Sequence, residues 1–208
     1  DPLLSVDSPG SLASKRGIPV LDPRGLRTEG FEAALADLEP DVAIMCGLRR
    51  LIPPNIIRIP KIAFVNIHTS LLPKHRGGTP TRWTIRYGET VTGVTAHFVD
   101  EHFDRGDILV QESLAVRQGE TWGELHVRMA EPTVRVTHTI LEMAANGRLV
   151  GSPQMEDLAS HEPPYKGEHR FIRWQLGADE IKRTCYAIRP GSGGMTAIAN
   201  KQVCVWDL

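Results

Sequence analysis

The segment Val65–Pro73 constrains this chain most, because an apolar run ends there in two polar side chains spaced two residues apart. The apolar residues from Ile62 to Ile67 predict a buried strand. Side chains at positions i and i+2 of a strand share a face, so Asn66 and His68 are expected to leave the strand end together. Open α/β sheets place their ligand sites at the carboxyl ends of strands. The segment therefore predicts an α/β fold with a site at this strand end.

The Asn66/His68 pair indicates acyl-type chemistry. An amide donates a hydrogen bond without carrying charge, and an imidazole titrates near neutral pH, so together they can polarise a carbonyl and move a proton. Taken alone, the same two side chains can simply satisfy local backbone groups. A second polar cluster, Asp100–Ile108, lies between two further strand-like runs and supplies acidic partners for the imidazole.

Hydrophobic periodicity predicts alternating helices and strands along most of the chain. Helices are expected over 29–38, 79–87 and 178–188, and strands over 42–46, 93–99, 108–116, 195–199 and 202–206. Thr121 and Glu124 have the spacing of a capping box and predict the start of a long helix. Pro132 is expected to kink that helix, and Asn146-Gly147 to end it.

Composition excludes several classes of protein. The 208 residues are 41% hydrophobic and 24% charged, as in ordinary globular proteins, and the net charge of −1 provides no overall attraction to nucleic acid or to an anionic membrane. No apolar run is long enough to span a membrane and no leader opens the chain, so a cytoplasmic location is expected. The odd cysteine count within apolar runs indicates reduced core thiols, with neither a disulfide framework nor a metal site; they are Cys46, Cys185 and Cys204.

A basic stretch follows the Asn66/His68 pair. It comprises Lys74, His75, Arg76, Arg82 and Arg86. A solvated face is the simpler interpretation of such a run. The alternative is a phosphate-bearing substrate, which arginine can hold through two parallel hydrogen bonds.

Several motifs follow one another in the order Asn66-Ile67-His68, Ser70–Pro73, Arg76-Gly77, Gly88-Glu89, Thr92–Thr95 and Asp104–Ile108. In this order they resemble the formyltransferase family that uses 10-formyltetrahydrofolate. The resemblance runs from about Ile18 to Leu149 and implies a Rossmann-like domain with a mostly parallel central sheet. The family's first strand, helix and strand have no counterpart here. Thr69 stands where many relatives have proline, which leaves both polar groups in place.

The resemblance implies a catalytic domain over residues 1–150. A polar, proline-containing linker is expected over 151–167, and a small α+β piece over 168–208. That last piece is similar to the beginning of the barrel-like second domain of methionyl-tRNA and aminoarabinose formyltransferases.

The resemblance also implies roles for individual residues. Asn66 would donate to the formyl oxygen, His68 would take the proton from the attacking amine, and Asp104 would orient the imidazole and favour its protonated form. Asp100 and Asp107 are the alternatives for the third role.

The donor, 10-formyltetrahydrofolate, is expected to bind largely through backbone groups and apolar walls. The residues that match the family's pterin-binding segments are Leu48, Arg50, Leu51, Ile52 and Asp100. For the acceptor, Arg76 and Arg82 are candidates to hold a phosphate, and Ser70 is a weaker candidate for holding water or substrate. A local turn hydrogen bond is the alternative for Ser70.

The expected reaction is formyl transfer to a small amine, with a nucleotide-linked amino sugar as the first choice of acceptor. Methionyl-tRNA formyltransferase is the main alternative, favoured by the C-terminal piece but not by the net charge or by Gly78-Thr79, where that branch has two alanines. A formyltetrahydrofolate hydrolase and an inactive folate-binding module are further alternatives. A homodimer is also compatible with the sequence, which does not define the oligomeric state.

Overall fold

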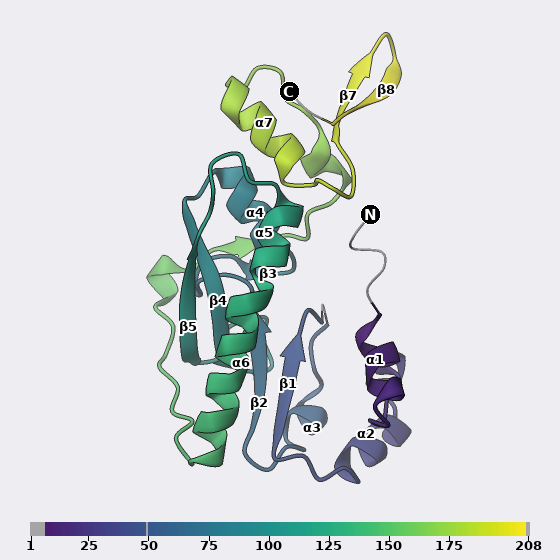
Figure 1. The fold of residues 1–208 in the computed structure, drawn as a ribbon, viewed down its shortest axis with the longest axis vertical. Helices are drawn as coiled ribbons and strands as arrows, with labels where there is room; N and C mark the ends of the chain where they lie inside the picture. The colour runs from purple at the N-terminus through teal and green to yellow at the C-terminus, as the bar shows by residue number, and fades with distance from the viewer. Residues whose placement is uncertain (1–6, 49, 207–208) are drawn as a thin grey trace.

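A four-stranded sheet forms the centre of the molecule (Figure 1), which a computed structural model describes over residues 7–48 and 50–206. The strands are β1 (Val42–Cys46), β2 (Ala63–His68), β4 (Val91–Phe98) and β5 (Ile108–Ala115), in the spatial order β1-β2-β4-β5. The predicted α/β class is confirmed. Residues 1–6, Arg49 and the last two residues lie outside the described part.

The central sheet is mixed, so the prediction of a mostly parallel sheet is wrong for the described strands. β1 and β2 run parallel, whereas β4 is antiparallel to both β2 and β5. For the β4–β5 pair the reason lies in the connection. It spans only residues 99–107 and contains no helix, and a parallel pair would need a longer crossover.

Helices cover both faces of this sheet (Figure 1). The helices are α1 (Pro9–Lys15), α2 (Glu29–Ala36), α3 (Pro54–Ile57), α4 (Pro80–Tyr87), α5 (Trp122–Arg128), α6 (Ala130–Ala145) and α7 (Ala178–Tyr186), with a 3₁₀ turn at Pro23–Gly25. The long helix α6 crosses one face, where Val136 and Ile140 pack with Val65 and Ile67 of β2 in the main core. Because strand side chains alternate, the neighbouring Asn66 and His68 face the other side.

The second face of the sheet carries a smaller apolar cluster of Leu26, Ile52 and Ile56, against which Phe64 of β2 packs. Two helical segments of the N-terminal part, α2 and α3, contribute to this cluster. Phe64 is followed on the same face by Asn66 and then His68. The strand therefore passes from an apolar environment into the polar site as it reaches its carboxyl end.

The capping box is present as predicted: the Thr121 hydroxyl accepts from the Glu124 amide, and the Glu124 carboxylate accepts from the Thr121 amide. The expected single kinked helix is two helices, since α5 ends at Arg128 and α6 begins at Ala130. Pro132 accounts for the position of this break, because proline lacks an amide donor and its ring clashes with the carbonyl four residues earlier, here that of Arg128.

The segment predicted as a linker is held against the β2–β5 part of the molecule along its length. It contains a 3₁₀ turn (Glu156–Leu158) and β6 (His161–Glu162), which pairs in parallel with β3 (Arg76–Gly77). Ser152 also bridges to Ile108 at the start of β5. The boundaries at 150 and 168 stay a prediction.

The C-terminal piece combines a 3₁₀ turn (Gly167–Arg170), α7 and the hairpin of β7 (Gly194–Ile198) and β8 (Lys201–Val205). The hairpin turn lies at Ala199-Asn200, one residue earlier than expected, and both residues have positive φ, 49° and 62°. Its small core contains Ile172, Ile181 and Cys185. All three cysteines are free, but Cys46 and Cys204 are exposed, so the expectation of core positions is wrong for these two.

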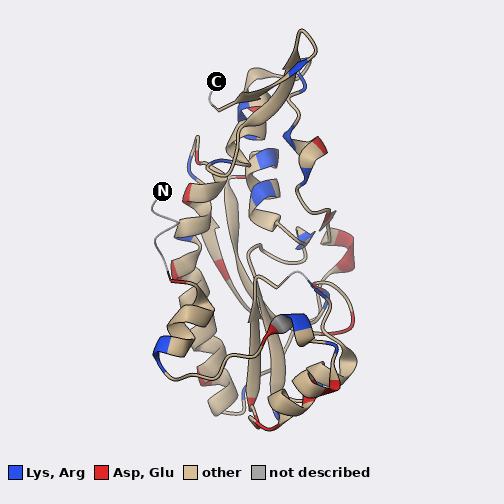
Figure 2. Ribbon diagram, turned by 90° about the vertical axis from the view of Figure 1, so that its right-hand side faces the viewer, with Lys and Arg blue, Asp and Glu red and all other residues tan. Residues whose placement is uncertain are grey.

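Charges of both signs are spread along the ribbon (Figure 2). No described helix is long and apolar enough to cross a membrane.

Candidate active site

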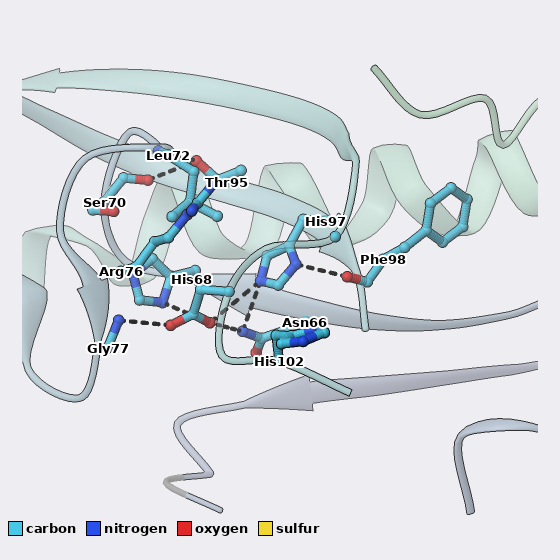
Figure 3. Close-up of polar contacts among 12 residues, drawn as sticks. Asn66, His68, Ser70, Leu72, Arg76, Gly77, Thr95, His97, Phe98 and His102 are labelled. Carbon is cyan, nitrogen blue, oxygen red and sulfur yellow. Dashed lines mark hydrogen bonds and ion pairs between the residues drawn. The ribbon is translucent and has the colours of Figure 1, made fainter. Parts of the chain in front are cut away.

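The end of β2 presents Asn66 and His68 on one face, where they are only 6% and 7% exposed. Asp104 reaches both from the loop between β4 and β5. Its Oδ1 accepts from the Asn66 amide nitrogen at 3.0 Å and lies 3.5 Å from Nδ1 of His68. Its other oxygen accepts from the Gly77 amide at 2.8 Å. The structure thus brings together the three side chains predicted as catalytic (Figure 3).

Hydrogen bonding defines the tautomer of His68. Nε2 lies 2.9 Å from the main-chain oxygen of His75, and a carbonyl can only accept, so Nε2 carries the hydrogen. In the neutral imidazole the lone pair is therefore on Nδ1, the nitrogen next to Asp104. This nitrogen is the one that can accept a proton from a substrate.

The pKa of His68 is lowered, chiefly because burial disfavours the charged imidazolium, and the Asp104 carboxylate opposes this only in part. The resemblance led us to expect that Asp104 would favour the protonated form; it does so, but burial outweighs it. Burial also works to raise the pKa of Asp104, yet contact with His97, the charge that His68 carries when it is protonated, and the Gly77 amide together hold that pKa below its ordinary value. A neutral base beside an ionised carboxylate results.

His97 is a fourth member of this cluster, and the sequence reasoning missed it. It pairs with Asn66 across β2 and β4, and its Nε2 accepts from the Asn66 amide nitrogen at 3.0 Å. Nδ1 donates to the Phe98 oxygen at 2.7 Å, which leaves Nε2 as the acceptor. The alternation of Thr95 and His97 in β4 was the available signal.

A cavity of about 650 Å³ opens over the cluster. Its walls include Asn66, His68, His97 and Asp104, together with all five residues expected to bind the donor, Leu48, Arg50, Leu51, Ile52 and Asp100. The size suits a ligand as large as a folate, since small-molecule pockets span roughly 300–1,000 Å³. Donor binding by these residues stays a prediction.

Arg76 is among the residues that line the cavity, but its guanidinium is already paired within the protein. The side chain is fully buried, and its guanidinium donates to both carboxylate oxygens of Glu156, at 2.7 and 2.9 Å, and to the Gln154 oxygen. A bidentate pair of this kind occupies the donors that would hold a phosphate. A phosphate would have to displace this pair, and the phosphate contact of Arg76 stays a prediction.

Ser70 and Arg82 are not brought to the cluster, because neither belongs to the cavity wall. The buried Ser70 hydroxyl donates to the Lys74 oxygen at 2.7 Å, which is the local turn hydrogen bond considered as the alternative. The Arg82 guanidinium lies over the ring of Trp122, 3.8 Å from its centroid, and Trp122 in turn lines the cavity. Arg82 therefore supports the wall from behind.

This arrangement defines an α/β domain whose cavity is built around an Asn–His–Asp cluster. A family model described as formyl transferase matches residues 4–141, so the chain belongs to the formyl transferase family.

Individual known proteins resemble the chain as well. A methionyl-tRNA formyltransferase of Pelotomaculum thermopropionicum is 36% identical over 91% of this chain and 60% of its own length. Among solved structures, HypX from Aquifex aeolicus in complex with tetrahydrofolic acid has a TM-score of 0.74 at 24% identity, covering 93% of this chain and 34% of that one. A sugar N-formyltransferase from a Shewanella species has a TM-score of 0.76 at 13% identity, covering 97% and 81%.

The chain spans 59–65% of the length of the curated relatives that it matches. At the identities given, the solved structures establish a shared fold.

Proposed function

We propose that this chain transfers a formyl group from 10-formyltetrahydrofolate to a primary amine. The observation that carries the proposal is the convergence of Asn66, His68 and Asp104 on one cavity, with Asp104 Oδ1 3.0 Å from the Asn66 amide and 3.5 Å from His68 Nδ1. Membership of the formyl transferase family and the cavity of about 650 Å³ support the folate donor.

His68 acts as the base in this proposal. A neutral amine attacks the formyl carbon, a new carbon–nitrogen bond forms, and the amine proton moves to Nδ1 of His68. The bond between the formyl carbon and the folate nitrogen then breaks, and that nitrogen receives the proton back from the His68 imidazolium. Because the pKa of His68 is lowered, the imidazole is free to accept at neutral pH, and general-base catalysis of this kind gives about a hundred- to ten-thousand-fold in rate.

Asp104 stabilises the imidazolium that forms, because its carboxylate lies next to the nitrogen that takes up the proton. The Gly77 amide fixes the second carboxylate oxygen, so the side chain cannot rotate away without losing that hydrogen bond.

Asn66 holds the developing oxyanion. Both of its amide hydrogens are engaged in this structure, one by Asp104 and one by the His97 ring nitrogen. In the proposed complex the formyl oxygen takes the place of His97 as acceptor, while Asp104 keeps the amide oriented. Such an oxyanion contact is worth about a hundred- to a thousand-fold in rate.

Two acceptors are proposed, each on a separate observation. The amino group of methionyl-tRNA is favoured by relatives with 30–36% identity over most of this chain, which are methionyl-tRNA formyltransferases. A nucleotide-linked amino sugar is the other acceptor, because Gly78-Thr79 stands where the methionyl-tRNA branch has two alanines, and sugar N-formyltransferases share the fold. Sequence similarity weighs more than shared fold for a substrate, so methionyl-tRNA is now the first choice.

The test measures tetrahydrofolate release by the purified chain from 10-formyltetrahydrofolate, with initiator methionyl-tRNA, with a panel of nucleotide-linked amino sugars, and without acceptor. Release that depends on one acceptor supports transfer to it, and a tRNA substrate should add strong salt dependence. His68→Ala should lower the rate of release by about a hundred- to ten-thousand-fold. The exposed His138 of α6 offers a matched control, and His138→Ala should leave it unchanged.

Other outcomes separate the alternatives. Equal release of folate and formate without any acceptor would show a hydrolase. Folate binding with no turnover, unaffected by His68→Ala, would show a binding module. Either result overturns the transferase proposal.

A further inference from the structure

We propose that Gln154 is a positioning residue that sets the spacing between Asp104 and His68, from a segment 50 residues beyond Asp104 in the sequence. The inference rests on the proposed function for its kinetic consequences, but not for its structural ones.

Gln154 uses both ends of its side-chain amide. Its Nε2 donates to two main-chain oxygens of the β4–β5 loop, Asp104 at 2.9 Å and Gly106 at 2.8 Å. Its Oε1 accepts from Arg76, at 3.1 Å from Nε and 2.8 Å from Nη2. A single amide thus joins the loop that carries Asp104 to the side chain of Arg76.

The loop that Gln154 holds is tightly constrained. Asp104 has a φ of 54°, a conformation that residues other than glycine rarely adopt. At Gly106 an added Cβ would lie 1.9 Å from the Phe98 oxygen, so this part of the loop passes directly against the end of β4. Two hydrogen bonds from Gln154 keep the Asp104 backbone in this conformation, which directs its carboxylate at His68.

Arg76, which binds the oxygen of the Gln154 amide, lies between two residues whose main chains contact His68 and Asp104. The residue before it, His75, accepts the Nε2 hydrogen of His68 at 2.9 Å through its main-chain oxygen. The residue after it, Gly77, donates its amide to Asp104 at 2.8 Å. Gln154 therefore connects the backbone that orients His68 with the backbone that carries Asp104.

Loss of the Gln154 hydrogen bonds should let the Asp104 loop relax and move its carboxylate away from His68. Three titratable side chains act on the pKa of His68, namely Asp104, whose charge raises it, and His97 and His75, whose charges lower it. Of these, only the Asp104 main chain accepts a hydrogen bond from Gln154. Relaxation of the loop should thus lower the pKa of His68 further.

The experiment titrates the imidazole of His68 by NMR in the full chain and, in parallel, measures kcat for formyl transfer against pH. Gln154→Met keeps the length and bulk of the side chain but removes its hydrogen bonds, and Gln154→Asn keeps the amide but shortens its reach. Both should lower the pKa of His68, in the same direction as Asp104→Asn but by less. Both should also lower kcat by about ten- to a hundredfold with little change in KM for the donor.

Gln118, exposed in the turn after β5, provides the matched control, and Gln118→Met should change neither quantity. If the pKa of His68 is unchanged in both folded Gln154 variants, the inference is overturned. If wild-type protein gives no formyl transfer at all, the proposed function fails instead, and the NMR titration still decides the role of Gln154.

Discussion

The site at the end of β2 and the C-terminal piece after residue 167 use their side chains in opposite ways. Around β2, polar groups are buried, and Asn66, His68 and Asp104 are each less than 10% exposed. In the C-terminal piece, large apolar groups are exposed: Phe171 by 44%, and Trp174 and Trp206 by 53% each. Burial of a polar group costs free energy unless hydrogen bonds replace those to water. The hydrogen bonds around β2 therefore fix the orientation of the buried side chains.

The C-terminal piece instead has a small core and several large apolar side chains that stay exposed among the described residues. Substitutions in the two regions should therefore separate catalysis from stability. Changes at β2 should alter turnover in a protein that still folds, whereas changes in the C-terminal core should alter local stability and leave the chemistry intact.

The largest effect is expected from His68→Ala, which removes the base. The rate of formyl transfer should fall by about a hundred- to ten-thousand-fold. The thermal stability of the variant should fall only slightly, because the substitution also removes a polar group whose burial costs free energy. Steady-state kinetics and calorimetry on the same preparations check this. A variant that loses stability and activity in proportion would break the contrast between the two regions.

Ile172→Ala should have the next largest effect, and on stability alone. Ile172 is 7% exposed and packs with Ile181 and Cys185, so its truncation leaves a cavity that costs about 2–5 kcal/mol. Hydrogen exchange should show faster opening of α7 and of the β7–β8 hairpin, while kcat is retained. Ile198→Ala, at a position 62% exposed, is the control. A large fall in kcat for Ile172→Ala would show that the C-terminal piece takes part in the reaction.

The same contrast explains which features could be predicted from the sequence. Strand β1 and the Thr121/Glu124 capping box depend on neighbouring residues, and their patterns were read correctly. The positions of Asn66 and His68 on one face also follow from strand periodicity alone. These features need no knowledge of distant segments.

Contacts between residues far apart in the sequence could not be predicted from local patterns. The pairing of Arg76 with Glu156 could not be recognised from the sequence, because the two residues lie 80 residues apart. His97 joins the cluster only because β2 and β4 are antiparallel in a register that places it opposite Asn66. The resemblance led us to expect mostly parallel strands, whereas β4 is antiparallel to both of its neighbours. Pairings between distant residues are set by the tertiary fold, which local periodicity does not encode.

Asp104→Asn tests the electrostatic role of the carboxylate beside His68, and its effect on kcat should be intermediate. The carboxylate beside Nδ1 stabilises the imidazolium, and removal of an opposite charge at such a distance typically shifts a pKa by about one to two units, so kcat should fall about ten- to a hundredfold. The acid limb of the kcat profile should also move to lower pH, because the pKa of His68 falls further. An acid limb that moves to higher pH would contradict the assigned pairing.

The smallest effect is a pH dependence of folding stability that originates in His68. Its pKa is lowered in the folded protein from 6.5, so below that pH the unfolded chain binds a proton that the folded chain does not. The His68 contribution to the free energy of unfolding is thus fully present above pH 6.5 and falls as the pH drops towards the folded pKa, by at most about 1.4 kcal/mol per pH unit. Denaturant unfolding between pH 5 and pH 8, the range in which histidines titrate, should show a shallower slope for His68→Gln than for the wild type. The matched substitution His138→Gln, at an exposed residue, should keep the wild-type slope. An unchanged slope in His68→Gln would mean that the imidazole is not buried in the neutral form, and the proposed base would then lose its physical foundation.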